Sequence, residues 1–249
     1  MNKSAIVLLS TLALSAGAQS PRTLLVREAE MTKPNRWETG VATRYQEVDS
    51  DLTQLKTWDF TPYARYGLLE RVSLDAAAAL RNAKTDGGGS EFGLGDFSLG
   101  VDFKMLMDVF GYPYLMPYAR LILPTGDDDK GLGAGSVGGI LGLSAGTTVN
   151  DDWHIVADIS TTTYSDDDIE DVLKVGGALI YDFTKQNSLI AEAQYVQDDN
   201  CYGKDGEALL YMGGIIYRPN RRLSITLQGG ASALDDSGLL GGAKVAYNF

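Results

Sequence analysis

Cysteine and histidine are almost absent from this sequence, and each absence excludes a class of chemistry. Cys201 is the only cysteine, so an intrachain disulfide and a cysteine-rich metal site are both impossible. His154 is the only histidine, which excludes most histidine-based metal sites and leaves one candidate partner for a catalytic nucleophile. We therefore predict a protein with no cofactor and no metal centre.

Positive charge and long apolar runs are scarce as well. The formal net charge is −12, which argues against nucleic acid as a partner. Residues 1–18 are typical of a secretory signal peptide, with Lys3 before an apolar stretch and Ala16-Gly17-Ala18 as the cleavage site. No later stretch approaches the roughly 18 apolar residues of a membrane-spanning helix. We therefore expect the mature protein to leave the cytoplasm without a helical anchor.

Glycine is abundant, at 29 residues, and it separates short segments that alternate between apolar and polar residues. Each segment is near or above the roughly 9–11 residues that a tilted strand needs to cross a bilayer. Charged residues lie within the polar faces, as expected for a hydrated lumen. The predicted strands are 36–46, 56–68, 71–82, 92–104, 113–123, 136–149, 153–164, 172–183, 188–197, 207–218, 222–232 and 238–249.

These strands predict an all-β fold, an antiparallel up-and-down transmembrane β-barrel of about 12 strands over residues 36–249. Residues 19–35 form an N-terminal periplasmic lead-in, and the sequence leaves open whether they fold into the lumen as a plug. Odd-numbered connections are long and acidic and even-numbered ones are mostly short, as in barrels with extracellular loops and periplasmic turns. Outward-facing aromatic residues fall near the two predicted rims: Trp37, Tyr66, Trp153, Tyr181, Phe183, Tyr247 and Phe249 near one, and Tyr45, Trp58 and Tyr195 near the other.

The last strand, which ends on Tyr247 and Phe249, resembles the closing strand of bacterial outer-membrane β-barrels. Lys244 departs from the pattern, because glycine is preferred five residues from the end. The resemblance implies the barrel-assembly machinery as a partner through this strand, with outer-membrane lipid and lipopolysaccharide around the barrel. It also implies secretion through the periplasm to the outer membrane.

Three stretches carry a narrower resemblance. They are Tyr63-Ala-Arg-Tyr-Gly-Leu-Leu-Glu-Arg-Val-Ser-Leu74, Gly93-Leu-Gly-Asp-Phe-Ser-Leu-Gly-Val-Asp-Phe-Lys104, and Leu121-Ile-Leu-Pro-Thr-Gly-Asp127 followed by Gly131 to Gly135. They resemble the "meta-pathway of phenol degradation" family, outer-membrane barrels often described as transporters and in some cases linked with aromatic compounds. The resemblance implies a transport role and does not identify a solute.

The lumen offers the candidate functional residues. They are Arg44, Arg65, Asp96, Asp102, Tyr114, Tyr118, Arg120, Asp158, Glu192 and Lys244. Small inward residues, namely Ala77, Ala79, Gly100, Gly138, Gly142, Gly176 and Ala178, are expected to leave room along the axis. Acidic runs at 127–129 and 166–168 are interpreted as solvated loops, in preference to the alternative of a divalent-cation site. A negatively charged mouth should disfavour anionic solutes.

These observations favour a passive outer-membrane channel or transporter for small solutes, with aromatic and hydrophobic compounds among the candidates. A closed structural or surface-anchoring barrel is the alternative, in which lumenal charges pair and close the path. An outer-membrane lipid hydrolase is the third hypothesis, because some barrels of this size use serine and histidine. His154 is predicted to face the lumen near the periplasmic end, so we expect no enzyme. Cys201 is predicted to be a surface thiol in a loop.

Overall fold

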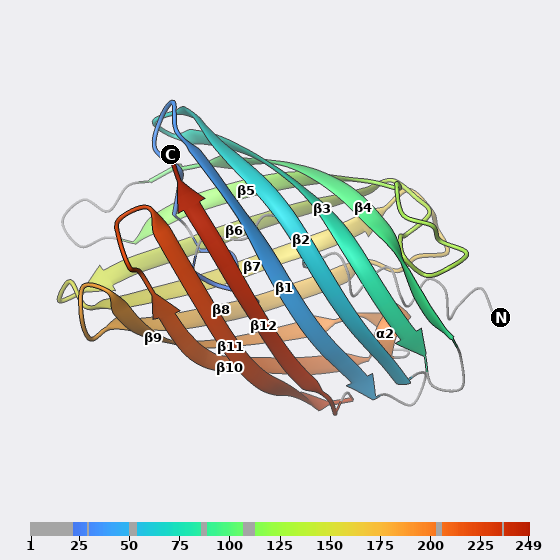
Figure 1. Ribbon diagram of the computed structural model, residues 1–249. Helices are drawn as coiled ribbons and strands as arrows, with labels where there is room; N and C mark the ends of the chain where they lie inside the picture. Colours follow the sequence, from blue (N-terminus) through green and yellow to red (C-terminus); the bar gives the residue numbers. More distant parts are fainter. Residues whose placement is uncertain are drawn as a thin grey trace.

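The computed structural model describes residues 22–28, 30–49, 54–85, 89–106, 113–202, 206–235 and 237–249, so the predicted signal peptide lies outside it. Within these ranges twelve strands form one closed antiparallel barrel, in which each strand pairs with its chain neighbours and β1 pairs with β12 (Figure 1). The predicted fold and strand count are confirmed. The strands are β1 Trp37–Asp49, β2 Gln54–Leu69, β3 Val72–Thr85, β4 Ser90–Phe103, β5 Tyr114–Leu123, β6 Gly138–Val149, β7 Trp153–Tyr164, β8 Val172–Asp182, β9 Asn187–Gln197, β10 Glu207–Tyr217, β11 Leu223–Leu234 and β12 Leu239–Asn248.

The first strands run further than their predicted ends. β1 continues to Asp49 instead of residue 46, and β3 continues to Thr85 instead of residue 82. The alternation persists there, because Val48 of β1 and Leu55 of β2 are both almost fully buried on the lumenal side. Their polar neighbours led the sequence prediction to stop early. The first two odd-numbered connections are consequently shorter than expected.

Each strand separates an inner from an outer face. In β2, residues from Leu55 to Gly67 alternate, with odd-numbered side chains buried and even-numbered ones facing outward. The outer face is apolar over the whole barrel. Large exposed side chains include Phe60, Phe92, Leu94, Leu121, Leu141, Ile155, Leu189, Ile215, Leu227 and Val245. A continuous apolar exterior on a closed barrel is typical of contact with lipid.

Aromatic pairs lie on this outer face where neighbouring strands are in register. Trp37 and Tyr66 have ring centroids 4.8 Å apart, and Trp153 and Tyr181 have centroids 4.5 Å apart. These pairs lie at the end of the barrel where β1 begins and β12 ends, which we call the terminal end. Tyr45 and Trp58 pair at 5.0 Å toward the opposite end, which we call the loop end.

A second aromatic pattern lines the inside. Tyr63, Tyr114, Tyr118 and Tyr164 each lie directly opposite a glycine on the adjacent strand: Gly40, Gly146, Gly142 and Gly138, respectively. A Cβ atom at any of these glycines would overlap the tyrosine ring. The missing side chains therefore let four tyrosine rings lie flat against the barrel wall.

One short helix, α2 (Asp199–Tyr202), lies in the connection between β9 and β10 at the loop end (Figure 1). Its Cys201 and Tyr202 are buried among apolar side chains of β1, β2 and β10. The prediction of a surface thiol at Cys201 is therefore wrong, because the loop folds inward over the barrel mouth. No helix in the described ranges is long and apolar enough to cross a membrane.

Candidate functional site

The lumen contains its own N-terminal chain. Residues 22–28, which we call the plug segment, form hydrogen bonds with lumenal side chains of β3, β4, β6, β9, β11 and β12. These strands surround the barrel, so a segment that reaches all of them crosses its interior. The question that the sequence left open for residues 19–35 is thus answered for residues 22–28.

The chain enters the lumen past Gly67 of β2. Asn35 N–H donates to the Gly67 carbonyl at 2.7 Å, and Gly67 N–H donates to the Arg36 carbonyl at 3.0 Å. A Cβ atom on Gly67 would collide with the backbone of Thr32 and Lys33. Glycine is required here by the close approach of two backbones.

Glu192 of β9 anchors the plug backbone. Its carboxylate accepts three consecutive backbone N–H groups, from Leu24 and Leu25 at 2.8 Å and from Val26 at 3.0 Å. Gln228 also donates to it at 2.6 Å. Successive N–H groups that converge on one carboxylate form an anion-binding concavity, here with the anion supplied by the barrel. Glu192 is 3% exposed, so these bonds lie out of bulk water.

Arg27 anchors the other side of the plug. Its guanidinium donates to Asp102 of β4 at 2.5 and 2.6 Å and to Asp75 of β3 at 3.0 Å. Arg120 donates to Asp75 at 2.9 Å, and Arg65 donates to Asp102 at 3.2 Å. The five side chains alternate in charge, which is the arrangement that makes buried ions tolerable.

Apolar contacts complete the attachment of the plug. Leu24, Leu25 and Val26 are each less than 5% exposed. They share one cluster with side chains of α2 and of the wall formed by β8, β9 and β10. The wall members of this cluster are Val172, Ala178, Val196, Ala208, Leu210 and Met212.

Most of the ten candidate residues gather around the plug. Arg65, Asp102, Tyr118, Arg120 and Asp158 surround Arg27, whose guanidinium lies 4.9 Å from the centre of the Tyr118 ring. Glu192 and Lys244 face the plug backbone instead, and Lys244 Nζ lies 3.5 Å from the Thr23 carbonyl oxygen. In this group the predicted residues are brought together.

The other three candidates lie elsewhere. Asp96 accepts the backbone N–H groups of Gly126 at 3.0 Å and Ala134 at 2.8 Å, so it holds the long loop between β5 and β6. The ring of Tyr114 lies 4.7 Å from Lys104 Nζ. Arg44 lies on the lumenal face of β1, opposite Asp59 in the strand register.

Sequence reasoning missed the plug residues themselves. Arg27 and the apolar run Leu24-Leu25-Val26 lie in a stretch that was interpreted as a lead-in. Three apolar residues followed by Arg27 and Glu28 were the available signal, since an exposed periplasmic lead-in has no need of them. Gln194, which donates to the Leu25 carbonyl at 2.9 Å, was also missed.

The expectation that small inward residues leave room along the axis is wrong for four of them. Tyr118 covers Gly142, Tyr164 covers Gly138, Asp75 covers Gly100 and Val26 covers Gly176. Beside the plug a cavity of about 40 Å³ remains, lined by Val26, Arg27, Tyr118, Arg120, Asp158, Lys174 and Gln194 among others. That volume holds a few water molecules.

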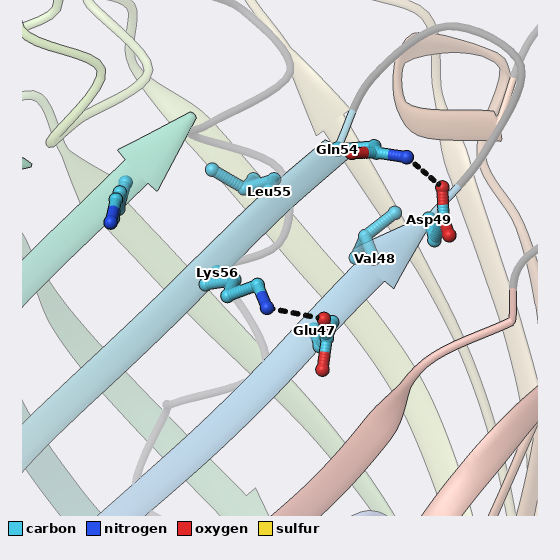
Figure 2. Close-up of a pocket in the computed structure, with 7 residues that line it drawn as sticks. Glu47, Val48, Asp49, Gln54, Leu55 and Lys56 are labelled. Carbon is cyan, nitrogen blue, oxygen red and sulfur yellow. Dashed lines mark hydrogen bonds and ion pairs between the residues drawn. The ribbon is translucent and has the colours of Figure 1, made fainter. Parts of the chain in front are cut away.

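A larger hollow, of about 230 Å³, lies at the loop-end rim of β1, β2 and β3. Figure 2 shows Lys56 pointing toward Glu47 and Gln54 toward Asp49, with distances of 2.6 and 2.8 Å. Each of these cross-strand pairs satisfies its own polar groups. The hollow lies at the rim, where the lumenal side chains of Val48 and Leu55 also line it.

Acidic side chains outside the barrel wall make local contacts. Lys130 donates to Asp127 at 2.5 Å, and this hydrogen bond lowers the pKa of the Asp127 carboxyl from its ordinary value. The Asp166 side chain accepts the Asp168 backbone N–H at 3.0 Å. Across the described part of the chain, no group of three His, Cys, Asp or Glu residues is arranged to hold a metal ion.

His154 lies in a polar cluster at the terminal end. Its two ring nitrogens lie 3.1 Å from Thr148 Oγ1 and 3.2 Å from Asp182 Oδ2. Asp182 also accepts from Ser188 at 2.5 Å and from Arg218 at 2.8 Å. This network ties β6, β7, β8 and β9 together at their ends.

Comparison with known proteins agrees with this architecture. Residues 36–249 match the model of the family described as "Putative MetA-pathway of phenol degradation". The chain belongs to this family. The match confirms the resemblance seen in the three sequence stretches, and it spans every strand of the barrel, from β1 to β12. No curated protein matches this chain.

Solved structures similar to this family member include an outer membrane channel from Pseudomonas putida F1, with 15% identity and a TM-score of 0.71 over 90% of this chain and 100% of that one. The KdgM porin in complex with disordered oligogalacturonate has 11% identity and a TM-score of 0.56 over 84% of this chain and 99% of the porin chain. The translocator domain of the autotransporter NalP from Neisseria meningitidis has 12% identity and a TM-score of 0.54 over 86% of this chain and 88% of the translocator chain. At these identities the likeness concerns the barrel fold.

Proposed function

We propose that this protein is an outer-membrane channel for small solutes whose conduction is controlled by the plug segment. The apolar exterior requires lipid around the barrel, and the lumen is lined by charged and polar side chains suited to a hydrated path. The observation that carries the proposal is the plug, because a single non-covalently held segment fills the interior of a wall that is already closed without it.

The outer-membrane location follows from the same surface. A barrel with large apolar residues around its exterior would aggregate in water. We propose that it reaches the outer membrane through the periplasm and that the strand ending in Tyr247 and Phe249 is read by the barrel-assembly machinery. Outer-membrane lipid and lipopolysaccharide would then contact the exposed side chains.

A structural barrel without transport is the second candidate, and one observation favours it. Arg120–Asp75, Arg65–Asp102 and Arg81–Asp59 are complementary pairs within the lumen wall. They would persist after the plug leaves. If they also close the path, the barrel would conduct nothing.

Single-channel conductance in planar bilayers distinguishes these two functions. The mature protein is compared with a variant that lacks residues 22–28, and both are first shown to be folded by their heat-modifiable mobility on gels. We expect rare, small openings in the full-length protein and frequent, larger ones in the variant. A folded variant that stays silent would overturn the channel and leave the structural barrel.

We propose no enzymatic activity. A lipid hydrolase would depend on His154, whose ring is engaged by Thr148 and Asp182 at the terminal end. Phospholipid hydrolysis by the purified protein and by His154→Ala tests this directly. Hydrolysis that is present in the first and lost in the second would contradict the proposal.

A further inference from the structure

Near the loop-end rim, the outward face of the barrel carries two lysines side by side. Lys56 of β2 and Lys84 of β3 are the only lysine or arginine residues on that face within the strands that the structure describes. They are directly opposite each other in the register of the two strands, and both are exposed. The Cβ atoms of such a pair lie within about 5.5 Å of each other. Two ammonium groups are therefore presented together on the side of the wall that contacts lipid.

The charges in this row do not cancel. Glu47 of β1 is opposite Lys56 and pairs with it at 2.6 Å (Figure 2). Lys84 has no hydrogen bond or ion pair among the described residues, and its neighbour in β4 is the neutral Ser90. Like charges directly opposite each other in a sheet are unfavourable. The row thus keeps one positive charge in excess, which an anion between the two lysines would neutralise.

Two other carboxylates lie near this rim, and neither is paired with Lys84. Asp49 is at the end of β1, two strands away from Lys84, and accepts a hydrogen bond at 2.8 Å from the side chain opposite it. Glu91 is opposite the buried Ala83, so it lies on the inward-facing parity of β4. Lys56 and Lys84 both line the rim hollow of about 230 Å³. Their side chains therefore share an open space in which an anion fits.

Two further rows follow on the same outward face, toward the middle of the barrel. The first consists of Tyr45, Trp58, Asn82 and Phe92, and the second consists of Thr43, Phe60, Leu80 and Leu94. The first row is mainly aromatic, with the ring centroids of Tyr45 and Trp58 5.0 Å apart, and the second is mainly apolar. Cation, aromatic ring and apolar side chain thus follow the order in which a lipid leaflet presents phosphate, headgroup boundary and acyl chain.

We propose that Lys56 and Lys84 bind a phosphate group of one lipopolysaccharide molecule, whose acyl chains lie along the apolar row. This inference rests on the proposed outer-membrane location, in which the loop end faces the cell exterior, and not on conduction. The two lysines require an anion, and the rows beside them require that the anion be joined to apolar chains. The acidic loops at this end would repel a free anion that arrives through water. A lipid reaches the lysines within the membrane plane instead.

Native mass spectrometry of the mature protein in neutral detergent with EDTA tests the site with diphosphoryl lipid A and with the same lipid after removal of its phosphates. We expect the phosphorylated lipid to bind at least about ten-fold more tightly, and Lys84→Gln to weaken its binding about five-fold, the effect of one basic residue at an anionic membrane surface. Lys84→Arg should preserve the affinity. The double variant Lys56→Gln, Lys84→Gln should bind both lipids alike. Lys185→Gln is the matched control, because that exposed lysine lies in the turn between β8 and β9 at the terminal end.

Heat-modifiable mobility first shows that each variant is folded. Four results would overturn the site: equal binding of the two lipids by the unmodified protein, a preference unchanged in the double variant, binding that appears only when calcium replaces EDTA, or inorganic phosphate that competes at the concentration of the lipid. The third would assign the lipid to a calcium ion held by carboxylates, and the fourth would identify a site for free anions. Failure here leaves the channel intact if the variant without residues 22–28 still conducts. Conversely, a folded barrel that binds the phosphorylated lipid and never conducts would reject the channel and keep the lipid site.

Discussion

The two sides of the lumen hold the plug segment by different chemistry. Along β3, β4 and β5 the inner wall is charged: Asp75 pairs with Arg120, and both Asp75 and Asp102 pair with Arg27 of the plug. Along β8, β9 and β10 the inner wall is mostly apolar, and two of its polar residues, Glu192 and Gln194, bind the plug backbone. The first wall therefore binds the plug through a specific side chain, and the second binds it through its backbone.

The charged wall therefore positions the plug, and the apolar wall excludes water from it. The charged wall favours arginine at one position, because the planar guanidinium presents a fixed fork of donors to two carboxylates at once. The apolar wall tolerates several side chains of similar volume. Substitutions on the two sides should therefore differ in size and in how well a conservative replacement restores the plug.

The largest effect is expected at Glu192. Glu192→Ala leaves the N–H groups of Leu24, Leu25 and Val26 without their acceptor. Losing three bonds to a charged group costs docking about 3 kcal/mol or more, which is a rise of roughly 100-fold in the ratio of open to closed channels. Open probability in planar bilayers measures it. Gln194→Ala, which removes one bond to the Leu25 carbonyl, should give about a tenth of that rise; equal effects would contradict the anchoring role of Glu192.

A smaller effect is expected on the charged wall. Arg27→Met removes the bonds to Asp75 and Asp102, but Arg120 and Arg65 remain to neutralise these carboxylates. We expect docking to weaken by about 2 kcal/mol, roughly a 30-fold rise in the open-to-closed ratio. Arg27→Lys is the control for geometry, since it keeps the charge and loses the fork. Full closure in Arg27→Lys would show that charge alone positions the plug.

The barrel could be predicted from the sequence because the patterns that specify it lie within each strand. Alternation of apolar and polar residues is repeated in every strand, and strand length is set by membrane thickness, so residues such as Leu223, Ile225 and Leu227 indicate their face without knowledge of neighbours. The closed barrel also determines which face of β10 points inward. There Met212 turns inward and Tyr211 outward, a choice that the sequence alone left ambiguous because both faces are apolar.

The plug and the pairing of lumenal charges could not be predicted in the same way. Which carboxylate meets which arginine depends on register and barrel shear, so Asp75 is matched to Arg120 across two strand boundaries. The filling of glycine positions by tyrosine also needs register, since Tyr118 and Gly142 are distant in sequence and opposite in the sheet. Arg27 had no periodic pattern to mark it.

The smallest effect is expected where the plug packs against the apolar wall. Val26→Ala removes apolar contact worth about 1 kcal/mol, which raises the open-to-closed ratio roughly five-fold. A Cβ atom on Gly176 of β8 would lie 2.6 Å from Val26 Cγ1 and 2.9 Å from the Ala193 carbonyl oxygen. Gly176→Ala alone should therefore push the plug away and also increase opening.

The double variant decides whether this contact is direct. Combining Val26→Ala with Gly176→Ala removes two carbon atoms from the plug and adds one methyl group to the wall, so the new side chain occupies part of the space that the old one leaves. We expect open probability near that of the unmodified protein, with a coupling energy of about 1 kcal/mol in the double-mutant cycle. Additive effects would mean that Gly176→Ala acts through the backbone of β9 instead. No such transfer can restore Arg27→Met, because volume is exchangeable across the apolar wall and a guanidinium between two carboxylates is not.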